Sequence, residues 1–227
     1  MQYADQPAYR AAEAAAILSL PVATVKSWAF GQQYTSKAGV ERKYQPLIAA
    51  ADSTNRVVSF TNLCELHVLA SIRRVHRIDM PKVRRSLRYV SEQLGVSRAL
   101  VAQNFLTNGI DLFVQKAGLI NVSREGQTAL RGELEAGLLR IDRDAKGGPV
   151  RLFPYTRLSA DAEQPRSVAL DPRIAFGRPV LLSAGVTTQV INDRFLAGDS
   201  FDEMADDFHV SVADIAEAVR FERRLAA

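Results

Sequence analysis

The sequence of 227 residues has little cysteine, tryptophan or histidine, with one, one and three of them respectively. A single cysteine, Cys64, has no partner for a disulfide within the chain and is typical of the reducing cytoplasm. No uninterrupted apolar run is long enough to span a bilayer. The first residues lack the basic start and the apolar stretch of a signal peptide. We therefore expect a cytoplasmic protein without a membrane partner.

Motifs of catalysis are also missing. The three histidines, His67, His76 and His209, show no metal-ligand spacing, so we expect no metal and no cofactor. Gly147-Gly148 predicts a turn and not a phosphate-binding loop. Acidic residues near the end of the chain fall at expected helix starts, where carboxylates complement the helix dipole more often than they bind magnesium. No nucleophile, base and orienting group can be assembled, so the sequence favours a binding protein over an enzyme.

Charge is unevenly distributed along the chain. The formal net charge is +4. Residues 1–100 hold 14 basic against 7 acidic side chains, whereas the remainder holds 15 against 18. A basic first half favours a polyanionic partner, and an acidic second half favours a different one.

Residues 9–28 carry the clearest local pattern, two short helices around a small core. Ser19-Leu20-Pro21 predicts the turn between them, because proline at or just before a helix start loses no hydrogen bond. Small, hydroxyl and basic side chains then project from the second helix and suit a major groove. They are Ala23, Thr24, Lys26 and Ser27. The expected core residues are Ala14, Ala15, Leu18, Leu20, Val25 and Trp28.

A wing is expected next, a β-hairpin that lies along the DNA backbone. Its predicted strands are residues 42–48 and 56–60, joined by the turn-rich segment 51–55. They would bring three cations near phosphates, Arg42, Lys43 and Arg56. Two helices are expected to follow, one over residues 60–74 and one from Met80. The second has an arginine-rich face, which in most helices is only solvated.

The front of the chain resembles the helix-turn-helix of the MerR superfamily. The shared pattern is E-A-A-x-x-L-x-L-x-x-x-T-[LV]-[KR]-x-W, which Glu13 to Trp28 match. The resemblance implies a winged helix-turn-helix domain over residues 1–96 that binds DNA. Such units usually read paired half-sites as two-fold dimers.

Residues 97–165 predict a smaller α/β region that would carry dimer contacts and end in a linker. A polar segment that ends in proline, residues 160–165, is the predicted linker. The expected elements are a β-hairpin over residues 112–122, a helix at about 127–143, a turn at 145–149 and a strand over 150–154.

The last sixty residues predict a short extended entry and three helices. Gly177 permits a backbone turn, and Pro179 fixes the next stretch as extended. Ser200 and Glu203 have the spacing of a capping box before a helix. The first expected helix covers residues 187–196 and turns Val190, Ile191 and Phe195 inward. Two further faces are Phe201, Met204, Ala205 and Phe208, and then Val212, Ile215, Ala216 and Val219.

This tail resembles the domain-of-unknown-function 433 family, which reads roughly as D-P-x-I-x-x-G-x-P-v followed by a three-helix unit. The matching residues are Asp171, Pro172, Ile174, Gly177, Pro179, Gly198, Ala205, Ile215 and Ala218. The chain departs from the family at residues 183–187, where many members carry G-T-R-[IV]. Members look like antitoxins of the VapB type, encoded beside a PIN-like ribonuclease toxin.

Together these features predict a mainly α fold with small β elements, in which a winged helix-turn-helix domain precedes a three-helix domain over residues 166–227. The resemblances imply a type II antitoxin that binds operator DNA to repress its own operon. It would neutralise a PIN-like (VapC-type) toxin as a homodimer or a toxin–antitoxin hetero-oligomer. An arginine would enter among the metal-binding carboxylates of the toxin. The candidates are Arg220, Arg223 and Arg224. The alternative is a stand-alone MerR-like regulator.

Overall fold

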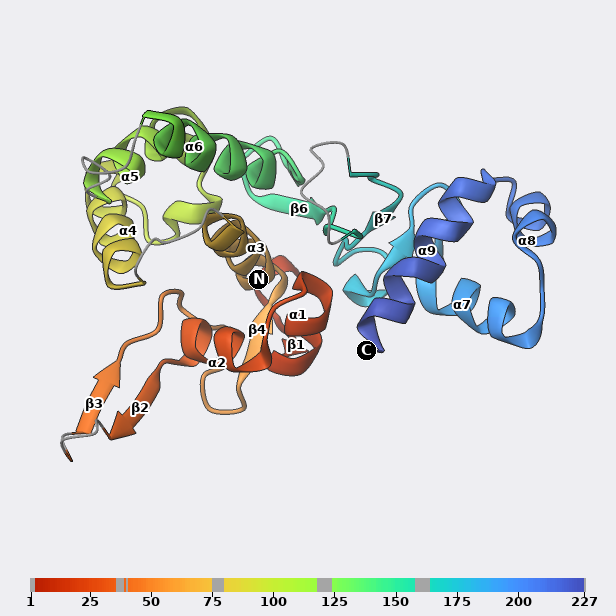
Figure 1. Cartoon of the computed structure of the whole chain (residues 1–227), viewed down its shortest axis with the longest axis horizontal. Helices are drawn as coiled ribbons and strands as arrows, with labels where there is room; N and C mark the ends of the chain where they lie inside the picture. Colours follow the sequence, from red (N-terminus) through yellow and green to blue (C-terminus); the bar gives the residue numbers. More distant parts are fainter. Residues whose placement is uncertain are drawn as a thin grey trace.

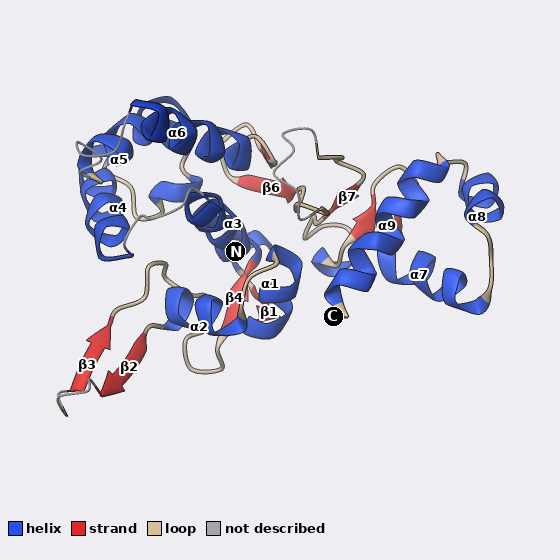
Figure 2. Ribbon diagram, in the orientation of Figure 1, coloured by secondary structure: helices blue, strands red, loops and turns tan. Residues whose placement is uncertain are grey.

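The computed structural model describes residues 3–35, 39, 41–74, 80–117, 124–157 and 164–226. Helices dominate, and the strands form four small antiparallel sheets, which confirms the predicted fold class (Figure 2). The front and middle of the chain form one end of an elongated molecule, and the last helices form the other (Figure 1). Among the described helices, none is both long and apolar enough to cross a membrane.

The first two helices form the predicted helix-turn-helix. Helix α1 spans Ala11–Leu18 and α2 spans Val22–Phe30. Ser19 ends α1 in the left-handed region, with φ 53°, and Pro21 is the N-cap of α2. The expected core residues are buried, except that Leu20 is only partly so. The regular spacing of small apolar residues was therefore sufficient to predict this unit from the local sequence.

The wing exists, but its strands differ from the predicted ones. Strand β2 (Gln32–Thr35) pairs with β3 (Glu41–Tyr44), in register from Gln32 opposite Tyr44 to Thr35 opposite Glu41. The predicted second strand, β4 (Val57–Ser59), pairs instead with β1 (Pro7–Arg10). The prediction was wrong because burial of Val58 and Tyr9 draws β4 into the core, away from the exposed hairpin.

Two helices follow with the predicted starts, α3 (Phe60–Arg74) and α4 (Met80–Leu94). Most of α3 is buried, so its polar residues need internal partners. Asn62 of α3 has four such partners. Its Oδ1 accepts from the backbone N–H of Ala51 and of Ser59, and its Nδ2 donates to Ala49 O and to Glu65 Oε2. Asn62 therefore ties the loop before β4 to the central helix.

The middle region is more helical than predicted. Residues 112–116 belong to a helix that Ala117 caps, not to a β-hairpin, because Ile110, Phe113 and Ala117 are buried at a helical spacing. The rest of that predicted hairpin, residues 118–122, lies outside the described residues, as does most of the predicted linker. The long helix ends at Leu138, not at 143. The elements are η1 (Tyr3–Asp5) at the N-terminus, then η2 (Ala99–Val101), η3 (Phe105–Gly109), α5 (Ile110–Lys116), α6 (Arg124–Leu138), β5 (Ile141–Arg143) and β6 (Pro149–Leu152).

The tail contains the three predicted helices behind a small sheet. Ser200 and Glu203 form the predicted capping box at the start of α8. Ile191 is buried and Phe195 packs on the same core, but Val190 is 45% exposed, contrary to the prediction, because the neighbouring Ile191 occupies the inner face of α7. The elements are β7 (Val168–Ala169), η5 (Ala175–Gly177), β8 (Val180–Leu181), β9 (Val186–Thr187), α7 (Thr188–Ala197), α8 (Phe201–Phe208) and α9 (Val212–Leu225).

Candidate nucleic-acid interface and its junction with the tail

Helix α2 and the β2–β3 hairpin flank an open groove of about 680 Å³. Ala23 and Lys26 are exposed on α2, and Ser27 is half-buried beside them. Lys43 of β3 and Arg56 of the loop before β4 are also exposed in this groove. Five of the seven predicted DNA-binding residues therefore line one surface. The remaining lining residues are Phe30, Gly31, Gln32, Gln33, Tyr44, Gln45 and Pro46.

The other two predicted residues have different surroundings. Thr24 is half-buried, and its hydroxyl accepts a hydrogen bond of 2.8 Å from Nη1 of Arg73 on α3. This contact fixes the orientation of Thr24 and links the second helix of the motif to α3. Arg42 lies in β3 next to Lys43, and its side chain lies outside the described residues.

The base of the hairpin is held by two helices. The guanidinium of Arg84 on α4 donates to the carbonyl oxygens of Gln45 and Pro46, the latter at 3.1 Å. Burial and the nearby charge of Arg88 lower the pKa of Arg84, but an arginine stays protonated. On the other side, Leu47 N donates to Trp28 O of α2 at 2.7 Å. The hairpin is thus positioned relative to α2 and not only by its own pairing.

Sequence reasoning missed Arg73 and the anchoring role of Arg84. Each contacts a residue 38 to 49 positions away, and no local pattern signals such contacts. The sequence did contain one signal for the true strands of the hairpin, which is the pair of glycines at its two ends. Gly31 ends α2, and Gly39 lies near the hairpin tip. Both have positive φ, 77° and 74°, a region that glycine adopts readily.

The cations around this groove whose side chains the structure describes form no ion pairs within the described part of the chain. Among the described side chains before Arg98, no lysine or arginine is paired with a carboxylate; the first such pair joins Arg98 and Asp5 at 2.6 Å. Unpaired cations create a positive potential that attracts phosphates. Of the exposed cations, Lys26, Lys43 and Arg56 line the groove, and Arg10, Arg73, Lys82, Arg85 and Arg88 are exposed elsewhere in the front of the chain.

The D-P-x-I-x-x-G segment connects the tail to the front of the chain. Gly177 has φ 79°, which confirms the predicted turn, and its carbonyl accepts a 2.8 Å hydrogen bond from the buried Tyr9 hydroxyl of β1. Asp171 is fully buried and accepts from the Arg173 guanidinium at 2.7 and 2.9 Å. Burial acts to raise the pKa of Asp171, but Arg173 and the charge of Arg151 lower it overall.

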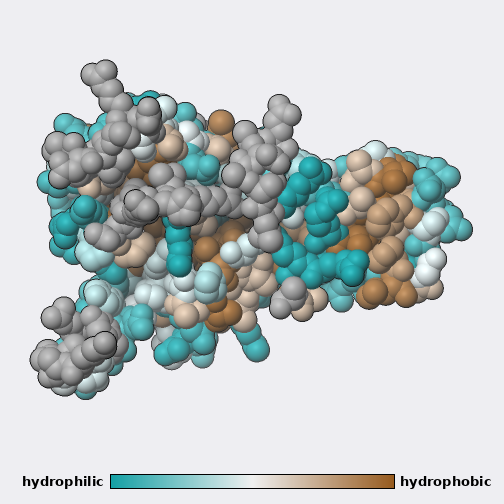
Figure 3. Space-filling view, in the orientation of Figure 1, coloured by the Kyte–Doolittle hydropathy of each residue, from teal (hydrophilic) through white to brown (hydrophobic). Residues whose placement is uncertain are grey.

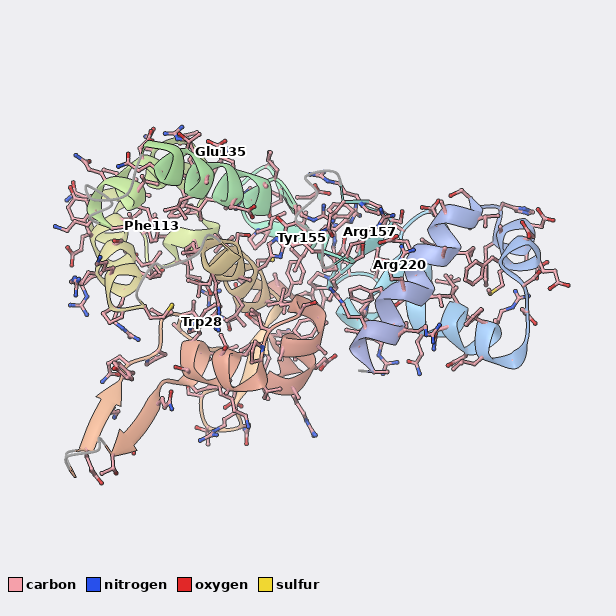
Figure 4. All side chains as sticks on the ribbon, viewed as in Figure 1. Trp28, Phe113, Glu135, Tyr155, Arg157 and Arg220 are labelled. Carbon is pink, nitrogen blue, oxygen red and sulfur yellow. The ribbon has the colours of Figure 1, made fainter. Side chains whose placement is uncertain are left out.

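A second polar cluster joins α9 to the segment after β6. Glu217 is buried, and its carboxylate accepts from Thr156, from Arg157 at 3.0 Å and from Arg220. Figure 4 shows Tyr155, Arg157 and Arg220 at this junction, and Figure 3 shows hydrophilic side chains over it. Arg224 donates to Tyr155 O at 2.5 Å and to Ile17 O of α1 at 3.1 Å.

The three arginines predicted to contact a partner therefore differ. Arg220 and Arg224 make contacts within the chain, whereas Arg223 is exposed in the last turn of α9. No group of three histidine, cysteine or acidic residues is placed to hold a metal ion in the part of the chain that the structure describes.

Two parts of the chain match known protein families. Residues 7–87 match the family described as "Putative DNA-binding HTH domain", and residues 168–221 match "Protein of unknown function (DUF433)". The protein named "Putative antitoxin VapB45" from Mycobacterium tuberculosis is 28% identical over 233 residues, which cover 95% of this chain and 93% of that protein. The X-ray crystal structure of Rv2018 from Mycobacterium tuberculosis has the same fold, with a TM-score of 0.68 at 21% identity over 94% of this chain and 97% of that one. The front of this chain is therefore similar to a helix-turn-helix domain, and its tail is similar to the DUF433 family.

Proposed function

We propose that this protein is an antitoxin that binds operator DNA with its front domain and neutralises a PIN-like ribonuclease toxin with its C-terminal domain. The observation that carries the proposal is the likeness to a protein named an antitoxin, which extends over both domains. The unpaired cations around α2 support the DNA-binding half independently. In this proposal the protein represses its own operon.

In the DNA complex, α2 enters the major groove with Ala23, Lys26 and Ser27 toward the bases. The hairpin lies along the backbone, so that Lys43 contacts phosphates, and Arg56 reaches the backbone from the loop before β4. Helix α4 extends this basic surface, because Arg84 anchors it to the hairpin base. Its exposed cations are Lys82, Arg85 and Arg88. A two-fold dimer would read two half-sites.

DNA binding is tested with a duplex from the promoter region of the gene, by fluorescence anisotropy at several salt concentrations. Lys26→Ala and Lys43→Ala are expected to weaken binding and to lower the salt slope by about one each. Thr24→Val is expected to change site preference more than non-specific affinity. Lys146→Ala is the control, because Lys146 is exposed in the β5–β6 turn, far along the chain from α2. Equal binding by all four variants would remove the DNA-binding half of the proposal.

In the toxin complex, Arg223 is the candidate that enters the active site of the ribonuclease. Its guanidinium would offset the carboxylate charge that the metal normally neutralises. Arg223 is exposed, and among the described residues it has no carboxylate partner within ion-pair distance. Arg220 and Arg224 are engaged at the junction and would serve this role less readily.

The toxin half is tested by co-purification with the product of the neighbouring gene and by a ribonuclease assay of that product. The full chain is expected to inhibit cleavage, and Arg223→Glu to inhibit much less than the control Lys146→Glu. Full inhibition by Arg223→Glu would refute the role of this arginine. A neighbour that neither binds nor cleaves RNA would refute the toxin and favour the alternative, a stand-alone MerR-like regulator.

A further inference from the structure

Phe176 is the most exposed large hydrophobic side chain in the part of the chain that the structure describes, at 95%. It lies in η5, within the D-P-x-I-x-x-G segment, between the half-buried Ala175 and the buried Gly177. A single exposed apolar residue is common on protein surfaces and has no special meaning by itself. This one is unusual because of the backbone that presents it.

The backbone of Phe176 is left-handed, with φ 56° and ψ 31°. Ala175 and Gly177 on either side also have positive φ, 47° and 79°. Glycine adopts this region readily, whereas bulky residues rarely do, and such strained positions cluster at binding sites. Burial of the ring does not offset the strain here, which indicates a contact outside the folded chain.

The turn is held by contacts that do not involve the ring of Phe176. Ile174 and Ala175 pack on a small hydrophobic cluster at the start of the tail. Gly177 N donates to Ile174 O at 3.0 Å, and Arg178 N donates to Ala175 O at 3.1 Å. The backbone that carries the ring is therefore in place before a partner binds, which lowers the entropy cost of binding.

The turn lies against the first helix of the helix-turn-helix, on a cationic surface. Tyr9, which donates to Gly177 O, stands two residues before the start of α1. Arg10, the N-cap of α1, is exposed, as is Arg178 just after the turn. Partial burial raises the pKa of Glu13 in the first turn of α1, and the charges of Arg178 and Arg10 oppose that rise. Both arginines therefore lie around this one carboxylate.

We propose that Phe176 and Arg178 bind the DNA that the helix-turn-helix reads, so that the DNA interface extends onto the tail. The inference rests on the proposed DNA binding of the front domain. In helix-turn-helix complexes the second helix enters the major groove while the first crosses the DNA backbone. Helix α1 lies between α2 and the tail (Figure 1). A duplex that takes α2 in its major groove would therefore pass along α1, where Arg10 and Arg178 lie.

The side chains of this surface suit the edge of a duplex. Among the described residues, neither Arg10 nor Arg178 has a carboxylate within ion-pair distance, and guanidinium forks match the oxygens of phosphate. Phe176 adds an apolar contact beside them, as rings do that DNA-binding proteins insert into the minor groove. An acidic protein would also complement the two arginines. DNA is favoured because a duplex bound at α2 already lies next to α1.

The first test measures the affinity of the full chain for promoter DNA by fluorescence anisotropy at several salt concentrations. Phe176→Asn removes the ring but keeps a side chain that tolerates the left-handed region. It should weaken binding about tenfold and leave the salt slope unchanged, because no charge is lost. Arg178→Gln should weaken binding and lower the salt slope by about one. Phe176→Tyr keeps an aromatic ring and should bind like the native chain.

Two exposed residues outside this surface provide the controls. Leu196→Asn removes an apolar side chain that is 71% exposed near the end of α7, and Lys146→Gln removes an exposed charge in the β5–β6 turn. Both should bind DNA like the native chain. The unfolding temperature of every variant shows whether it still folds, and the separate changes at Phe176 and Arg178 keep the test valid if one variant does not.

The second test shortens the duplex from each end to the shortest one on which Lys26→Ala and Lys43→Ala still weaken binding. The native chain and Phe176→Asn should bind this short duplex equally, because the bases beside α1 are gone. A difference that persists on it would mean that Phe176 acts through the fold and not through DNA, and would overturn the inference.

The remaining outcomes separate this inference from the proposed function. If Lys26→Ala weakens binding of the long duplex while Phe176→Asn and Arg178→Gln bind it like the native chain, the inference fails and the proposed DNA reader stands. Native DNA binding together with lost co-purification of the neighbouring gene product would assign the turn to a protein partner instead. A native chain that does not bind promoter DNA would overturn both.

Discussion

Gly31 connects α2 to the hairpin. Gly31→Ala should move the hairpin relative to α2 and weaken DNA binding. Its φ of 77° and ψ of −179° lie in a region that only glycine occupies readily, which costs other residues about 1–3 kcal/mol. An added Cβ would also lie 2.5 Å from Tyr44 O and 3.3 Å from the Pro46 ring. Tyr44 O is a backbone atom held by pairing with Gln32, so it cannot rotate away.

The hairpin must therefore move, while the core remains intact. Loss of about 1–3 kcal/mol from the DNA complex corresponds to an affinity that is roughly fivefold to 150-fold weaker. The unfolding temperature should change little, because Tyr44 is 41% exposed and the hairpin buries few apolar residues. Fluorescence anisotropy with promoter DNA measures the first quantity and thermal unfolding the second.

Gly39→Ala is the matched control for this prediction. Gly39 lies in the same hairpin with φ 74°, but an added Cβ would meet nothing within 4 Å. It therefore carries the conformational cost without the collision, and its effect on DNA affinity should be the smaller. If Gly31→Ala binds DNA as tightly as Gly39→Ala, the hairpin position does not govern binding and the reasoning fails.

Three further predictions concern stability, each measured by urea unfolding. The free energy of unfolding should fall as the pH rises from about 4.5 to about 7. Burial raises the pKa of Glu65 to about 7, so in this range the folded chain keeps a proton that the unfolded chain releases. Glu65→Gln should reduce this dependence on pH. Glu217→Ala should cost about 1–3 kcal/mol, because the Thr156 hydroxyl loses its acceptor while the half-exposed arginines return to water. Tyr9→Phe should cost about 1 kcal/mol and leave DNA binding unchanged, because only the hydrogen bond to Gly177 is lost.

Elements that depend on local periodicity and caps were predictable. The helix-turn-helix, the starts of α3 and α4, and the capping box at Ser200 follow from side chains within a few residues of each other. Their boundaries need no knowledge of distant contacts. In the tail, two apolar residues that were expected on an inner face are exposed instead, Val190 of α7 and Val212 of α9, at 45% and 42%.

Strand pairing was not predictable in the same way. Val57–Ser59 has the pattern of a wing strand, yet it pairs with Pro7–Arg10 about fifty residues earlier. Nothing near it in the sequence specifies that choice, which is decided by burial in the assembled core. The prediction for residues 112–117 was wrong for another reason. The alternating pattern of a strand was preferred to the helical spacing of Ile110, Phe113 and Ala117. The candidate groove was largely predictable, but Arg73 and Arg84 reach it only through the tertiary fold.

The positions of the tail arginines bear on whether the two proposed partners act independently. Arg224 holds α9 against Ile17 at the end of α1, and the adjacent Arg223 is the residue proposed to reach the toxin. A toxin bound at Arg223 would therefore contact the same helical turn that anchors the tail to the helix-turn-helix. If binding there shifts α9, the affinity for DNA changes, and by thermodynamic linkage DNA changes the affinity for toxin by the same factor. Two surfaces that share one helical turn are separable only if that turn stays rigid in both complexes.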